Sequence, residues 1–224
     1  MNAGSTPAVD GRPAVNTDAA PVRMQPFTVV SGPAPHIARP NLDTDIIIRI
    51  ERLTALAKEE LGPYAFEALR TLADGTPAPD FVLNQPRFLG APILLAAENF
   101  GCGSSREAAV WALQGIGIRC VIAPSFGDIF AGNCFQNGVL PIRLPAAQID
   151  ALAADASQGA HVVVDLTDCT VTSPTGQHLS FAVDPMRREC LLEGLDDIGL
   201  TLKDDSLVRE WQRHDRQRRP WIWP

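Results

Sequence analysis

A glycine-rich turn carries the residues of this chain that are best suited to chemistry. Residues 99–107 read Asn-Phe-Gly-Cys-Gly-Ser-Ser-Arg-Glu and lie between an apolar run and an alanine-rich stretch typical of a helix. A strand, a turn and a helix start in this order form an anion site, because free backbone N–H groups and the helix dipole favour negative charge. Arg106 adds a planar guanidinium that can grip a carboxylate with two hydrogen bonds. Ser104 or Ser105 would then lie beside a bound acid.

The same turn also allows a purely structural role. Ser104 and Glu107 have the spacing of a capping box, in which the two side chains cap the first turn of a helix. Spacing alone supports capping and anion binding about equally. The turn is not a P-loop, since no Gly-Lys-Ser/Thr closes it, and Arg106 replaces the third glycine of a dinucleotide fingerprint. It also differs from the Gly-x-Ser-x-Gly nucleophile elbow.

A second polar group, Asp43-Thr44-Asp45, precedes the apolar run Ile46-Ile47-Ile48. The β-branched run predicts a strand buried on both faces. Two carboxylates at its start could do acid–base work or hold a cation. Composition favours hydrogen bonds to the backbone of a turn instead.

Three apolar runs alternate with two helical stretches and predict the framework that positions these residues. The runs are 91–97, 119–123 and 139–142, and the second helix is expected to start near Ser125 and end before Gly138. This order predicts a parallel βαβ core whose ligands bind at the carboxyl ends of the strands.

The segments around this core are expected to add further strands and helices. A strand is expected at 27–32 and a largely helical region at 51–73. Beyond a short helix at 148–156, the pattern favours antiparallel strands, and a final helix is expected from about Pro185 through Gly194.

Composition excludes several classes of protein. The chain has 224 residues, 46% of them hydrophobic, and a net charge of −7, which gives no support to general nucleic-acid binding. Its apolar runs are too short to span a membrane. Five cysteines without a Cys-x-x-Cys pair argue against a disulfide framework and against a metal or cluster site within this chain.

Both ends differ from the centre. Residues 1–23 are rich in Ala, Pro and Gly without the apolar core of a signal peptide, so we expect a disordered extension and a cytoplasmic protein. Residues 209–224 form a basic tail with three tryptophans. A docked or frayed terminus is favoured there over a nucleic-acid site. The expected domain between them is 24–208.

The turn 101–107 closely resembles the Gly-x-Gly-Ser-Ser-Arg-Glu signature of the aconitase superfamily. Segments 74–86, 122–126, 128–130, 133–135 and 194–202 resemble the small subunits of 3-isopropylmalate dehydratases. Two features depart from the family pattern. Ala108 stands where the family has histidine, and Ile46–Tyr64 differs from the segment that contains the substrate-recognition loop in relatives.

The resemblance implies an α/β fold, the swivelling β/β/α domain of that superfamily. It implies a hydro-lyase subunit that works with a large subunit carrying a [4Fe–4S] cluster, in leucine biosynthesis. Ser104 would be the catalytic base, Ser105 and Arg106 would hold substrate carboxylate, and Thr44 and Asp45 would line the site. The substrate would be isopropylmalate. One alternative is a related hydro-lyase subunit that acts on a methylmalate, dimethylmalate or homoaconitate type of acid. Another is a non-catalytic binding or regulatory subunit.

Overall fold

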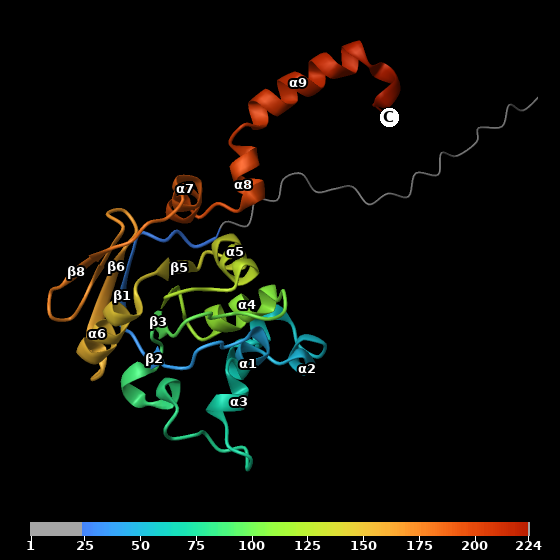
Figure 1. Ribbon diagram of the computed structural model, residues 1–224. Helices are drawn as coiled ribbons and strands as arrows, with labels where there is room; N and C mark the ends of the chain where they lie inside the picture. Colours follow the sequence, from blue (N-terminus) through green and yellow to red (C-terminus); the bar gives the residue numbers. More distant parts are fainter. Residues whose placement is uncertain (1–23, 224) are drawn as a thin grey trace, which may run out of the picture.

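The computed structural model describes residues 24–223 and shows two four-stranded sheets with helices packed around them (Figure 1). The extension predicted at 1–23 lies outside the described residues. Besides the elements introduced below, short 3₁₀ helices η3 (Val82–Asn84) and η4 (Pro86–Phe88) precede the first long strand of the parallel sheet.

The parallel sheet has the strand order β2-β3-β4-β5. Its strands are β2 (His36–Ile37), β3 (Ile93–Ala96), β4 (Cys120–Ala123) and β5 (Leu140–Arg143). Helices α4 (Glu107–Gly115) and α5 (Asp128–Gln136) connect the last three strands, which confirms the predicted βαβ core. Every residue of β3 and β4 is buried, as expected for strands covered on both faces.

The second sheet is antiparallel, with the strand order β1-β6-β7-β8. Its strands are β1 (Val29–Pro33), β6 (His161–Asp165), β7 (Thr170–Thr172) and β8 (His178–Ser180). The sequence predicted these strands but not the pairing of β1 with β6, which lies far along the chain. In this pairing Val30 lies opposite Val164.

Alternate residues of the parallel sheet face two separate cores. Ile93, Leu95 and Ile122 pack toward the antiparallel sheet and helix α6 (Ala146–Ala156). Leu94 and Val121 pack toward α4 and α5 on the opposite face. The antiparallel sheet, the parallel sheet and helices α4 and α5 thus form three successive layers. This arrangement confirms the predicted β/β/α fold class.

The prediction of a strand at Ile46–Ile48 is wrong. Helix α1 (Thr44–Ile47) occupies this place because the Asp43 carboxylate accepts a hydrogen bond from the Ile46 N–H over 2.8 Å and caps the helix. Asp43 therefore has the turn role that composition favoured. The helical region predicted at 51–73 is broken into short pieces: α2 (Ile50–Leu53), η1 (Lys58–Glu60), η2 (Gly62–Tyr64) and α3 (Glu67–Arg70).

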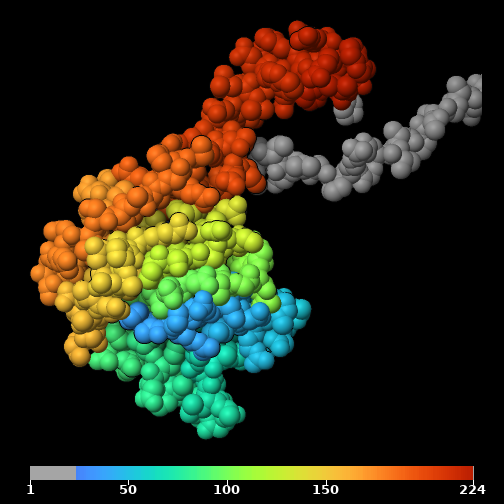
Figure 2. Space-filling model, viewed as in Figure 1, coloured from blue at the N-terminus to red at the C-terminus, as the bar shows by residue number. Residues whose placement is uncertain are grey.

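Three helices follow the antiparallel strands, so the prediction of a single final helix is wrong. Helix α7 (Pro185–Glu193) ends at Gly194 with a left-handed φ of 68°, as predicted. Helix α8 (Asp197–Leu202) leads to α9 (Asp205–Arg218), which stands away from the layered body, and η5 (Pro220–Ile222) follows it (Figures 1 and 2). Helix α9 runs across the predicted boundary at 208/209, so the division into domains stays a prediction.

Candidate active site

The glycine turn lies at the carboxyl end of β3, where a parallel sheet usually binds ligands. Gly101 has a φ of +70°, and a Cβ atom built there would lie 2.3 Å from the ring of Phe130. Only glycine fits this position. The turn is fastened to the segment before α1, since Gly101 N–H donates to Leu42 O over 2.7 Å and Thr44 N–H donates to Cys102 O over 3.0 Å.

The predicted capping box is wrong. Helix α4 begins at Glu107, and Arg106 rather than Ser104 occupies the N-cap position. The Glu107 carboxylate accepts a hydrogen bond from Asn137 Nδ2 over 2.8 Å, and Asn137 Oδ1 accepts one from the Trp111 indole over 2.9 Å. Glu107 therefore ties α4 to the end of α5, and Ser104 has no part in a capping box.

The segment at Thr44 holds the main chain of the turn. The Thr44 hydroxyl donates a hydrogen bond to the carbonyl of Ser104 over 3.0 Å, and Thr44 is only 1% exposed. A buried hydroxyl with one fixed partner is costly to remove. The hydrogen bond from Thr44 therefore holds the main chain from which the Ser104 side chain projects.

Asp45 and Arg106 form an ion pair through Arg106 Nη1. The same nitrogen lies 3.4 Å from the carbonyl of Ile48. The Arg106 side chain is 15% exposed and that of Asp45 is 53% exposed, so the guanidinium lies in the wall of the site with the carboxylate at its rim. Both contacts orient the guanidinium beside the N-terminus of α4.

All five predicted site residues come together. Thr44 and Asp45 reach the turn from α1, while Ser104, Ser105 and Arg106 belong to the turn itself. Both serine residues are exposed. The first backbone N–H groups of α4 and the Arg106 guanidinium favour an anion at this place.

A cavity of about 430 Å³ adjoins the turn. Ser105 and Arg106 line one side, together with Ala108, which is 7% exposed. The other side is mainly apolar and is formed by α2, the segment 56–61 that contains η1, and the ring of Trp111. The Lys58 ammonium lies 4.9 Å from the centre of that ring. The remaining lining residues are Ile50, Leu53, Leu56, Leu61 and Glu107.

Sequence reasoning found the segment that forms this apolar wall but not its residues. The segment is folded into short helices that follow no sustained period, so periodicity could not show which side chains face the cavity. The spacing of Leu53 and Leu56, three residues apart, was the one feature of the sequence that could have indicated which side chains form this wall.

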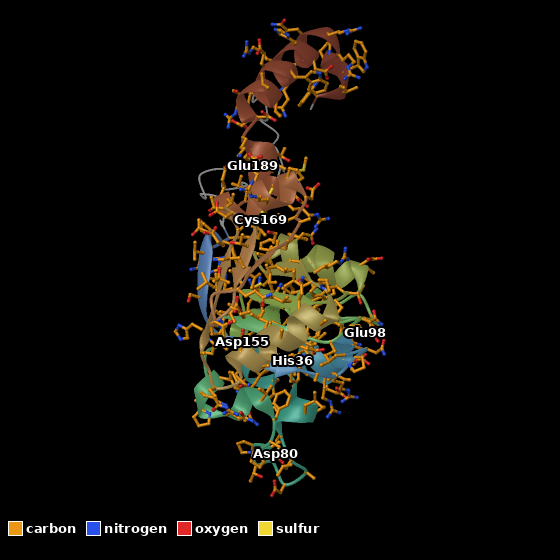
Figure 3. The ribbon with its side chains drawn as sticks, turned by 60° about the vertical axis from the view of Figure 1, so that its left-hand side comes forward. His36, Asp80, Glu98, Asp155, Cys169 and Glu189 are labelled. Atoms are coloured by element: carbon orange, nitrogen blue, oxygen red, sulfur yellow. The ribbon has the colours of Figure 1, made fainter. Side chains whose placement is uncertain are left out.

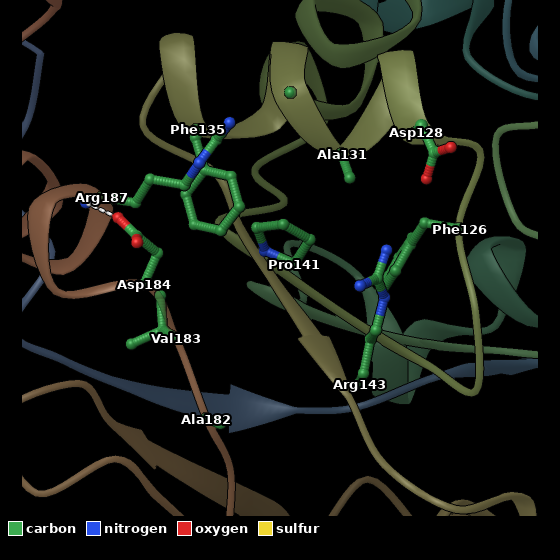
Figure 4. A pocket seen from close by; sticks show the side chains of 11 residues that line it. Phe126, Asp128, Ala131, Phe135, Pro141, Arg143, Ala182, Val183, Asp184 and Arg187 are labelled. Carbon is green, nitrogen blue, oxygen red and sulfur yellow. Dashed lines mark hydrogen bonds between the residues drawn. The ribbon is translucent and has the colours of Figure 1, made fainter.

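A second hollow, of about 310 Å³, lies between α5, β5 and residues 182–187 (Figure 4). The Arg187 guanidinium lies 4.7 Å from the centre of the Phe135 ring, and Asp184 caps α7 by accepting from Arg187 N–H. Asp128 and Arg143 face the hollow from the other end. The predicted site residues do not line this hollow, so we treat it as separate from the candidate site.

Two of the five cysteines are fully buried and are not suited to hold an iron–sulfur cluster. Burial raises the pKa of the Cys120 and Cys134 thiols, whereas cluster ligands must be thiolates. Among residues 24–223, no three His, Cys, Asp or Glu side chains gather as metal ligands.

No helix in the described part of the chain is long and apolar enough to cross a membrane.

Comparisons with known proteins agree with this geometry. Residues 24–147 match the family described as the aconitase C-terminal domain, and residues 150–185 match the family described as LeuD_N. The first match defines the class of protein: a hydro-lyase domain of the aconitase superfamily.

Curated relatives define the family more closely. The 3-isopropylmalate dehydratase small subunit of Paramagnetospirillum magneticum is 48% identical over 201 residues, which are 89% of this chain and 100% of the relative. That of Jannaschia sp. is 49% identical with the same coverage. The chain therefore belongs to the family of 3-isopropylmalate dehydratase small subunits.

A solved structure supports the same assignment. The crystal structure of a 3-isopropylmalate dehydratase from Methanocaldococcus jannaschii superposes with a TM-score of 0.61 at 26% identity. The match covers 82% of this chain and 99% of the archaeal one. The designation of the bacterial relatives as small subunits implies that those proteins work with a large subunit.

Proposed function

We propose that this chain is the small subunit of a 3-isopropylmalate dehydratase, which interconverts 2-isopropylmalate and 3-isopropylmalate in leucine biosynthesis. The observation that carries the proposal is the convergence of Thr44, Asp45 and the turn Ser104–Arg106 beside a largely apolar cavity. A hydroxy-acid with a branched alkyl group needs both an anion site and an apolar wall.

The reaction removes a proton from a carbon next to a carboxylate, releases hydroxide from the neighbouring carbon, and then adds water back in the opposite sense. Negative charge develops on the carboxylate side as the proton leaves, so fixed positive charge lowers the barrier. Arg106 and the N-terminus of α4 supply this charge. Arg106 uses Nη1 for Asp45, which leaves its Nε–Nη2 edge to hold a carboxylate, with the hydroxyl of Ser105 beside it.

Ser104 is the proposed base that takes the proton at its Oγ. A serine hydroxyl is a weak base at neutral pH and acts as one only where nearby positive charge stabilises the alkoxide. The Thr44 hydrogen bond to the Ser104 carbonyl holds the main chain from which the Ser104 side chain projects. Asp45 keeps the guanidinium in place.

The remaining half of the site would come from the large subunit. A [4Fe–4S] cluster there, as the family resemblance implies, would act as the Lewis acid for the departing hydroxide. The exposed positions of Ser104 and Ser105 fit a surface that another chain covers. We propose a heterodimer, or a multiple of it, in the cytoplasm, without a nucleic-acid or membrane partner.

The apolar wall favours isopropylmalate over a homoaconitate type of substrate. The additional carboxylate of the latter would face Leu53, Leu56 and Trp111, with only the exposed Lys58 ammonium to neutralise it. Methylmalate and dimethylmalate would fill less of the cavity.

Assay of the assembled pair with a panel of these acids tests the proposal. The highest kcat/KM is expected for 2-isopropylmalate, and a higher value for another acid would assign the chain to a paralogous hydro-lyase. Substrate binding without any dehydration would identify a non-catalytic binding subunit.

A further inference from the structure

Helix α9 and the segment after it are not explained by the active site. The helix stands apart from the layered body in Figure 1, and a view turned by 60° shows the same separation (Figure 3). It lies at the opposite end of the molecule from Asp80, and its main contacts within the described chain are with η5.

One face of α9 is apolar and exposed. Leu207, Val208 and Trp211 share this face and are 62%, 39% and 59% exposed. Arg209, Arg213 and Arg216 lie at i, i+4 and i+7 on the opposite face. An isolated helix of 14 residues is only marginally stable in water, and such helices are normally stabilised by packing of their apolar face.

The residues after α9 are bonded back to the end of the helix. Asp215 is 7% exposed, and its carboxylate accepts hydrogen bonds from Arg219 Nε over 2.7 Å and from Trp223 Nε1 over 2.9 Å. The Arg216 guanidinium lies 4.9 Å from the centre of the Trp223 ring. We call residues 219–223 the C-terminal hook. It presents Trp221, which is 78% exposed, and Ile222, which is 50% exposed.

We propose that α9 and the C-terminal hook form a docking element for the large subunit. The inference rests on the proposed function, which requires a large subunit. An ordered amphipathic helix with exposed Trp211, followed by a hook with exposed Trp221, fits the groove of a partner chain, where aromatic side chains act as anchors.

Charge disfavours pairing of α9 with the α9 of a second copy. Residues 205–223 contain five arginines against three carboxylates, within a chain of net charge −7. The complementary surface is an apolar groove with an acidic rim. A second α9 carries the same excess of arginines, so pairing of two copies through this helix would bring like charges together.

The test measures binding of the full-length small subunit to the purified large subunit by isothermal titration calorimetry. The double variant Leu207→Ala/Trp211→Ala is expected to raise Kd by at least about tenfold, as loss of an aromatic anchor does. Gln217→Ala, exposed on the same helix, is the matched control and is expected to change Kd less than about twofold. Trp221→Ala, which lies outside the helix, is expected to weaken binding without disturbing α9.

Other results would overturn the proposal. A Kd unchanged in both the double variant and Trp221→Ala would do so. Circular dichroism of the double variant shows whether α9 is still helical, so that a rise in Kd can be assigned to lost contacts. Loss of small-subunit dimers in analytical ultracentrifugation, with an unchanged Kd for the large subunit, would assign the face to a second copy. Loss of binding to a labelled single-stranded RNA, again with an unchanged Kd, would assign it to RNA. A pair that binds normally but converts no isopropylmalate would contradict the proposed function and leave the docking element intact.

Discussion

The Thr44 hydroxyl donates a hydrogen bond to the main-chain carbonyl of Ser104 over 3.0 Å, although 60 positions separate the two residues in the sequence. Thr44 is buried, whereas Ser104 is exposed. A group in the core thus sets the position of a residue at the surface. This relationship joins helix α1 to the glycine turn and gives the candidate site a fixed geometry.

Thr44→Val keeps the shape of the side chain but removes this hydrogen bond. The carbonyl of Ser104 loses its partner, so we expect the free energy of unfolding to fall by about 1–2 kcal/mol and kcat to fall with it. Thermal unfolding and steady-state assays of the assembled pair measure both. The control is Thr54→Val, where an exposed threonine hydroxyl donates to Glu51 O over 3.1 Å and where a change below about 0.5 kcal/mol is expected. Equal effects of the two substitutions would show that the Thr44 contact is unimportant.

Arg106→Lys keeps the positive charge and loses the planar fork. We expect kcat/KM for isopropylmalate to fall by about 100-fold, because an ammonium cannot contact Asp45 and a substrate carboxylate with the same geometry. Asp45→Asn keeps the guanidinium but removes its charged partner, and a smaller loss is expected. If Arg106→Lys were fully active, the guanidinium would not be the carboxylate anchor.

Gly101→Ala tests whether the close contact with Phe130 requires glycine. A methyl group at this position would overlap the ring, and the positive φ adds strain, so the free energy of unfolding should fall by about 3–5 kcal/mol. Gly75 has a similar φ of +84°, and a methyl group there would meet no atom within 4 Å. Gly75→Ala therefore isolates the strain and is expected to cost about 1–2 kcal/mol. Chemical denaturation of both variants would reveal the difference, and its absence would refute the packing argument.

The C-terminal hook is expected to open in acid. Hydrogen bonds from Arg219 and Trp223 lower the pKa of Asp215, so the folded hook favours the charged carboxylate. This stabilisation is complete above the ordinary carboxyl pKa and is lost as the pH falls through the lowered value. Tryptophan fluorescence should report a transition in that range for the wild type. Asp215→Asn should show no such transition, and an identical acid transition in the variant would exclude Asp215 as its origin.

The sequence predicted the elements of the βαβ core because their apolar runs are continuous and separated by glycine, proline and polar residues. It failed at Ile46 and Ile47, which lie in helix α1 because Asp43 caps it, while Ile48 ends the helix in an extended conformation. It also allowed a capping box at Ser104 as one of two alternatives, although Asn137, thirty positions away from Glu107, holds that glutamate. The first error arises because a local cap at Asp43 outweighs the β-branched pattern, and the second involves a residue far away in the sequence.

The sequence also predicted one part of the candidate site and missed another. The turn motif and the Asp-Thr-Asp element indicated the five residues that the structure brings together. The pairing of Asp45 with Arg106 and the apolar wall of the cavity depend on how α1, α2 and η1 pack against α4, and these contacts have no signature in the sequence.

The role of Ser104 as the base is tested most directly by turnover of 2-isopropylmalate by the assembled small and large subunits, with serine or alanine at this position. We expect Ser104→Ala to bind the large subunit as tightly as the wild type and to lower kcat by about 10²–10⁴-fold, the usual contribution of a general base. Ser105→Ala is expected to act mainly on KM. A Ser104→Ala complex with wild-type kcat would contradict the assignment of Ser104 as the base.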